Sequence, residues 1–118
     1  MSLHRLTPEK VSTTAQNVVA RLHPTVVEEV ATAVARDRFV VVGMAQNPFV
    51  KKARRLLDEA GTHYTYLEYG SYFSQWKERL ALKLWAGFPT FPMVFVDGTL
   101  EGGHSELMEL AKTGRLKS

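Results

Sequence analysis

The sequence contains no cysteine among its 118 residues, and this absence excludes several kinds of chemistry. A chain without thiols cannot form disulfides, attack a substrate with a thiolate, or hold an iron–sulfur cluster with its own cysteines. A zinc site built from thiolates is excluded for the same reason. The histidines are scattered, and His104 has no second ligand at a useful spacing, so the sequence predicts no metal site.

Long apolar runs are also missing. No stretch is long enough to cross a bilayer, and the first ten residues, MSLHRLTPEK, lack the apolar centre of a signal peptide. We therefore expect a cytoplasmic protein that makes no contact with a membrane. Internal repeats and low-complexity segments are absent too, which favours an ordinary globular chain.

The charge balance favours neither sign strongly. The formal net charge is +3, which would suit an anionic partner. Acidic residues are interspersed among the basic ones, however, and no basic run adjoins exposed aromatic residues, so nucleic-acid binding is not expected. A hydrophobic content of 45% with 23% charged residues is enough for one domain with a real core.

The pattern at the start of the chain predicts two helices. Residues 1–23 are expected to form a helical extension, with Thr7 as N-cap and Pro8 in the first turn. Residues 24–118 are expected to form the main domain, whose first helix opens at Pro24. The apolar residues of one face are Val11, Ala15, Val18 and Leu22 in the extension, and Val26, Val27, Val30 and Val34 in the next helix. Either helix could pack on the domain or contact a partner.

From Arg38 onward the pattern alternates between strands and helices. The continuous β-branched run RFVVVGM is typical of a buried central strand, and Asn47 and Pro48 are suited to begin the helix that follows. Trp76 and Trp85 are expected to pack against the core. The predicted elements, in order, are strand 38–44, helix 47–61, strand 62–69, helix 71–87, strand 88–98, strand 99–103 and helix 104–114. This order predicts an α/β fold of thioredoxin type, with a sheet of about four strands flanked by helices.

One long motif points to a family. The segment RLALKLWAGFPTFPMVFVDGTLEGG combines two basic residues four apart, a Pro-Thr-x-Pro sequence, a strand, a turn and a Gly-Gly pair. The residues in these places are Arg79, Lys83, Phe88, Pro89, Thr90, Pro92, Gly102 and Gly103. From about Pro24 to Leu116 the chain resembles the glutaredoxin family, most closely its monothiol branch. The resemblance implies a glutaredoxin-type fold and a cis peptide bond before Pro92.

The chain departs from this family where the family carries its chemistry. Asn47 and Val50 stand where relatives have cysteine, or cysteine and serine, at the start of the first core helix. Ala45 stands nearest to the place of a lysine that binds the glycine carboxylate of glutathione. His104 and Ser105 replace the residues that hold the γ-glutamyl end. A hydrogen bond to a charged group contributes ~1.5–3 kcal/mol, so two lost contacts would weaken glutathione binding by about two to four decades.

The resemblance also implies a groove and a set of lining residues. Asn47 is interpreted first as a helix cap, and Pro92 first as an element of the fold. The residues expected at the groove are Asn47, Phe49, Arg79, Lys83, Phe91, Pro92, Gly103, His104 and Ser105. No residue is expected to be catalytic, because thiol–disulfide exchange requires a thiolate at the attacking position.

Three interpretations remain open at this point. The first is a redox-inactive glutaredoxin-like binding or scaffold protein with a weak groove for glutathione or another small anion. By analogy with the monothiol branch, a BolA-type protein is a possible partner. The second is a thiol-free enzyme acting on another anionic small molecule. The third is a protein-interaction module in which the groove is a relic and the N-terminal helices make the contact.

Overall fold

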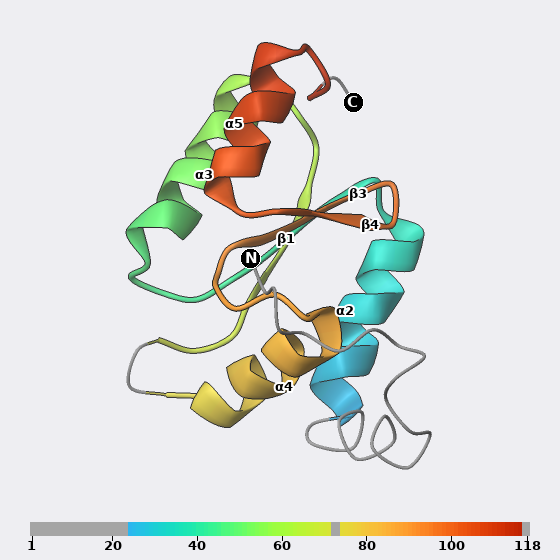
Figure 1. The fold of residues 1–118 in the computed structure, drawn as a ribbon, viewed down its shortest axis with the longest axis vertical. Helices are drawn as coiled ribbons and strands as arrows, with labels where there is room; N and C mark the ends of the chain where they lie inside the picture. The colour runs from blue at the N-terminus through green and yellow to red at the C-terminus, as the bar shows by residue number, and fades with distance from the viewer. Residues whose placement is uncertain (1–23, 72–73, 117–118) are drawn as a thin grey trace.

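The computed structural model describes residues 24–71 and 74–116 (Figure 1). The helical extension expected in residues 1–23 lies outside the described residues, so that prediction and the proposed domain boundary stay predictions. The described elements are α2 (Pro24–Arg36), β1 (Phe39–Gly43), α3 (Pro48–Glu59), β2 (Thr65–Glu68), α4 (Trp76–Ala86), β3 (Met93–Val96), β4 (Thr99–Gly102) and α5 (His104–Lys112). Their order is the predicted one.

The strands form one mixed four-stranded sheet in the order β2-β1-β3-β4. β1 pairs in parallel with β2 and antiparallel with β3, and β3 and β4 form an antiparallel hairpin. Val40 therefore lies between Thr65 on one side and Phe95 on the other. This is the strand–helix–strand unit followed by a hairpin that the sequence predicts, and it confirms the thioredoxin-type, glutaredoxin-like fold.

Helices cover both faces of the sheet (Figure 1). Val40 and Val42 of β1 point to the face covered by α2 and α4, whereas Phe39 and Val41 point to the face covered by α3 and α5. All residues of β1 are buried because the strand is central and covered on both faces. The β-branched run in the sequence reflects this double burial.

The apolar stripe predicted for α2 is confirmed, whereas one prediction for α4 is wrong. Val27 and Val30 are buried, and Trp85 packs against the core with its ring centroid 6.1 Å from that of Phe95. Trp76 is 59% exposed instead of packing on the core. It is the first residue of α4 and lies about 120° around the helix from buried Leu82.

Three chain segments meet at one edge of the sheet. β1 ends there at Gly43, β3 begins there at Met93 because it runs antiparallel to β1, and β4 ends there at Gly102. The peptide bond between Phe91 and Pro92, just before β3, is cis, as the family resemblance implies. Candidate functional residues from distant parts of the sequence therefore come together at this edge.

No helix in the described part of the chain is long and apolar enough to cross a membrane.

Candidate functional site

A groove of about 490 Å³ opens where these segments converge. Every residue predicted to line it does so except Arg79. The predicted lining residues are Asn47, Phe49, Lys83, Phe91, Pro92, Gly103, His104 and Ser105, and the structure adds Met44, Phe88, Pro89, Thr90 and Glu106. The added Phe88, Pro89 and Thr90 belong to the motif that carries the family resemblance.

The two positions where the family resemblance implies sulfur have structural roles in this chain. The Asn47 side-chain oxygen accepts hydrogen bonds from the backbone amides of Phe49 at 2.9 Å and Val50 at 3.1 Å. Asn47 is thus the N-cap of α3, with Pro48 following in the first turn. Val50 is 2% exposed and belongs to the core. Neither residue provides a nucleophile to the groove.

Phe49 forms an aromatic wall at the mouth of the groove. Its side chain is 52% exposed. The ring centroids of Phe49 and His104 are 6.0 Å apart, so the first turns of α3 and α5 meet across the groove. Lys52 Nζ lies 5.3 Å from the centroid of the Phe49 ring.

Lys83 places a positive charge on another side of the groove, away from Phe49. It comes from the last turn of α4, and its Nζ lies 5.8 Å from the centroid of the Phe91 ring. Phe91 is 6% exposed, so the groove has an aromatic floor beside a cation. This arrangement suits a ligand with an anionic end and an apolar or peptide body.

The structure places Arg79 outside the groove. Its side chain is 7% exposed, and its guanidinium donates hydrogen bonds to the backbone oxygens of Tyr69, at 3.1 Å, and Ser74. The predicted contribution of Arg79 to the groove is therefore corrected, because its donors are directed at the chain segment before α4. The spacing of four residues from Lys83 places the two side chains near each other on the helix but does not determine which one faces the groove.

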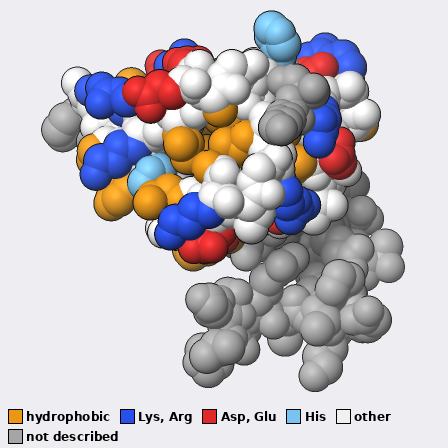
Figure 2. Space-filling model, turned by 90° about the horizontal axis from the view of Figure 1, so that it is seen from above, with side chains coloured by type: hydrophobic (Ala, Val, Ile, Leu, Met, Phe, Trp, Pro, Cys, Tyr) orange, Lys and Arg blue, Asp and Glu red, His pale blue; other side chains and the backbone are white. Residues whose placement is uncertain are grey.

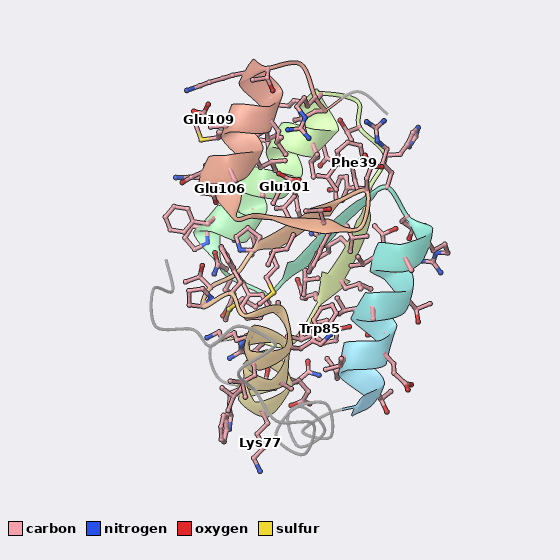
Figure 3. The ribbon with its side chains drawn as sticks, turned by 45° about the vertical axis from the view of Figure 1, so that its right-hand side comes forward. Phe39, Lys77, Trp85, Glu101, Glu106 and Glu109 are labelled. Atoms are coloured by element: carbon pink, nitrogen blue, oxygen red, sulfur yellow. The ribbon has the colours of Figure 1, made fainter. Side chains whose placement is uncertain are left out.

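Glu106 is the functional residue that the sequence reasoning missed. Its Oε1 accepts a hydrogen bond from the backbone amide of Gly103 at 2.7 Å, at the start of α5 (labelled in Figure 3). A Glu three residues after a helix cap is a known capping pattern, so the spacing Gly103-x-x-Glu106 could have indicated it. The carboxylate adds a negative charge to a groove that the sequence predicted to favour anions.

The lining does not form a recognisable catalytic arrangement. Ser105 and His104 are adjacent in the first turn of α5, and among the described residues no hydrogen bond joins the Ser105 hydroxyl to a base. No group of three or more potential metal ligands occurs in the described part of the chain. Figure 2 shows basic and acidic side chains mixed around exposed hydrophobic ones on the face that it presents.

Comparisons with known proteins agree with this geometry. No protein-family model matches the chain. A glutaredoxin-like protein of Dictyostelium discoideum is 45% identical over 116 residues, which cover 98% of this chain and 94% of that protein. Glutaredoxin 1 of Rickettsia conorii is 35% identical over 77 residues, covering 65% and 74% respectively. The crystal structure of a buckwheat glutaredoxin–glutathione complex has the same fold, with a TM-score of 0.69, 24% identity, and coverage of 80% of this chain and 86% of that one.

Proposed function

The chain belongs to the glutaredoxin family, and from this premise we propose that it is a redox-inactive binding protein whose groove takes glutathione or a similar small anionic peptide. The observation that carries the proposal is the groove itself. Lys83, Pro92 and Gly103 still line it, whereas the cysteine positions hold a helix cap and a core valine. We assign the chain to the monothiol branch within the same proposal, on the motif that ends at Gly103.

The groove offers complementary groups to each part of a peptide ligand. Lys83 would pair with a carboxylate, and the backbone of Phe91, which precedes the cis bond, would pair with the ligand backbone as a neighbouring strand does. The buckwheat glutaredoxin that shares this fold was crystallised with glutathione, which supports the choice of ligand. Phe49 would cover the side of the ligand that carries the sulfur.

Binding is expected to be weak. The Gly103 amide already donates its hydrogen bond to the Glu106 carboxylate, so it is not available to a ligand. The negative charge of Glu106 also repels an anion at the start of α5. The family contacts missing at Ala45 and Ser105 remove further charged partners. Losing two such contacts costs about two to four decades of affinity, which would raise a micromolar dissociation constant to about 0.1–10 mM.

Thermal unfolding with increasing reduced glutathione tests the binding. A ligand that binds only the folded chain raises the unfolding midpoint as its concentration rises. Lys83→Gln should abolish most of this rise, because it removes the cation of the groove. Lys112→Gln is the matched control: Lys112 is exposed on α5 and contacts Glu109 at 3.6 Å, away from the groove lining. Equal responses of the two variants, or no response of the natural chain, would overturn the proposal.

A turnover assay tests the absence of redox activity. Thiol–disulfide exchange needs a thiolate, so the purified chain should not reduce a glutathione mixed disulfide faster than a protein-free control. Restoring a thiol by Asn47→Cys, in the first turn of α3, provides the positive comparison, because a helix N-terminus favours the thiolate. Turnover by the natural chain would contradict the proposal.

A protein-interaction role is the second candidate, and one observation favours it. The exposed hydrophobic side chains of α4 lie outside the groove lining. A BolA-type partner follows from the family analogy alone and remains a proposal on that ground. No observation favours a thiol-free enzyme.

A further inference from the structure

The outer face of α4 is apolar along its whole length. Trp76, Leu80 and Leu84 are 59%, 42% and 47% exposed. Their spacing of four residues shifts each one by about 40° around the helix, so they form one continuous stripe, here called the α4 ridge. The opposite face is buried against the core through Ala81 and Leu82. A helix on a protein surface normally carries polar residues on its outer face.

Two lysines border the α4 ridge. At 100° per residue, Lys77 and Lys83 lie on opposite sides of Leu80, each about 60° away from it. Figure 3 shows Lys77 projecting away from the molecule at the outer end of α4. Lys83 is also the lysine of the groove, so the α4 ridge runs up to the groove edge. The surface is thus a narrow apolar stripe with a positive charge along each margin.

We propose that the α4 ridge is the docking surface for an amphipathic helix of another protein, whose apolar seam is bordered by Asp or Glu residues. The α4 ridge covers about 80° of the helix surface, which is the width of a seam between two helices. Acidic residues on both margins of the partner helix would meet Lys77 and Lys83, which fixes its position on α4.

The positive charges of Lys77 and Lys83 disfavour two other occupants of the α4 ridge: a second copy of the chain and residues 1–23. In a symmetric antiparallel pairing of two copies centred on Leu80, Lys77 of one copy would share a margin with Lys77 of the other, and Lys83 would share the opposite margin with Lys83. Like charges in such positions destabilise the contact. Residues 1–23 of the chain carry three Arg or Lys residues against a single acidic residue, so their charge does not complement the lysines either.

The direct test is a pair of synthetic helical peptides titrated into the full chain, with backbone amides observed by NMR. Both peptides are about 14 residues long, lack tryptophan and share one leucine seam, but one has Glu and the other Lys beside that seam. The acidic peptide should cause saturable shifts confined to α4 and its margins, and the basic peptide should bind at least ~10-fold more weakly. Leu80→Glu should weaken the binding of the acidic peptide by a similar factor.

A charge-reversal variant distinguishes specific docking from non-specific hydrophobic binding. The double variant Lys77→Glu with Lys83→Glu should prefer the basic peptide, whereas the natural chain prefers the acidic one. Met108→Glu is the matched control, because Met108 is an exposed apolar residue (42%) on α5 in the other helical layer, and it should change nothing.

Several results would overturn the proposal. They are equal binding of both peptides, no exchange of preference in the double variant, stronger binding to vesicles containing an anionic phospholipid, and shifts of the α4 amides caused by raising the protein concentration alone. Contacts between residues 1–23 and α4 in the chain without peptide would also overturn it, since the chain would then cover its own α4 ridge.

Discussion

The side chain of Asn47 accepts two backbone hydrogen bonds at the start of α3, from the amides of Phe49 and Val50. An amide oxygen satisfies donors that a helix leaves without partners within its own backbone, and an alanine cannot do this. At this position the chain therefore has a stabilising cap where the family resemblance implies a reactive sulfur.

This cap predicts a specific pattern of stability. Asn47→Ala should lower the free energy of unfolding by ~1 kcal/mol, whereas Asn47→Asp should preserve it, because aspartate caps helices as well as asparagine does. Urea denaturation of the three proteins measures the difference. Equal losses for Ala and Asp would mean that the hydrogen bonds to Phe49 and Val50 contribute nothing to stability.

Arg79 has a structural role that can be separated from ligand binding. Arg79→Met removes the donors to the backbone oxygens of Tyr69 and Ser74, and charged hydrogen bonds of this kind are each worth ~1.5–3 kcal/mol. We expect a loss of about 3 kcal/mol or more in unfolding free energy, with glutathione affinity unchanged below the melting transition. A variant of unchanged stability but reduced affinity would show that Arg79 contacts the ligand after all.

At the residue scale, the sequence predicted the identity of groove residues better than their orientation. Phe91, Pro92 and Gly103 were predictable because their motif has a fixed spacing, and the sheet brings its parts together. Arg79 was misplaced because helical spacing does not say which of two neighbouring long side chains turns inward. Glu106 was missed because its role depends on the conformation of the Gly103 backbone.

At the scale of elements, strands and helices were predictable from their periodicity, but their exposed faces were less so. The run from Phe39 to Gly43 is typical of a strand buried on both sides, and the structure confirms this. Trp76 was predicted to be buried because large aromatic residues usually are. In α4, however, apolar residues occur on both faces, so hydrophobicity alone could not identify the inner one.

Close packing between β1 and α3 depends on a glycine. A Cβ atom added to Gly43 would lie 2.7 Å from Val50 Cγ1 and 3.0 Å from the Tyr66 ring. Gly43→Ala should therefore destabilise the chain by about 1–3 kcal/mol through overpacking. In combination with Val50→Ala, which removes the contacted methyl groups, the total loss should be smaller than the sum of the two single losses. Strict additivity in urea denaturation would contradict this account of the contact.

A carboxylate joins the end of α2 to the start of β2. The Asp37 side chain accepts hydrogen bonds from the Arg36 guanidinium at 2.7 and 2.9 Å and from the Thr65 hydroxyl at 2.7 Å. These bonds, chiefly those from Arg36 and then the one from Thr65, lower the pKa of Asp37 to about 2. The folded chain therefore holds this carboxylate charged at pH values where the unfolded chain protonates it.

The lowered pKa predicts the sign of a pH effect. Because the folded-state pKa lies below the ordinary value of 3.8, the stabilisation is complete above about pH 4 and is lost as the pH falls toward about 2. Asp37→Asn should flatten the dependence of unfolding free energy on pH within this window and leave its shape above pH ~5 unchanged. Denaturation curves at several acidic pH values measure the slope. An identical slope in the variant would show that Asp37 does not account for it.

At the scale of the whole molecule, the sheet topology creates the groove and leaves the α4 ridge beside it. The ends of β1, β3 and β4 converge at one edge of the sheet (Figure 1). Lys83 of α4 lines the groove at that edge. Under the proposed function, the groove is a binding site that has kept its shape and lost its redox chemistry.

The most direct test is an NMR titration of the full chain with reduced glutathione, observing backbone amides up to millimolar ligand, roughly the weak limit of a specific contact. We predict saturable shifts clustered at Asn47, Lys83, Phe91 and Gly103, with the Arg79 amide affected no more than its neighbours in α4. Absence of shifts, or small shifts spread over the whole surface, would contradict the account. The family relationship would then explain the fold alone, and the groove would have no role as a glutathione site.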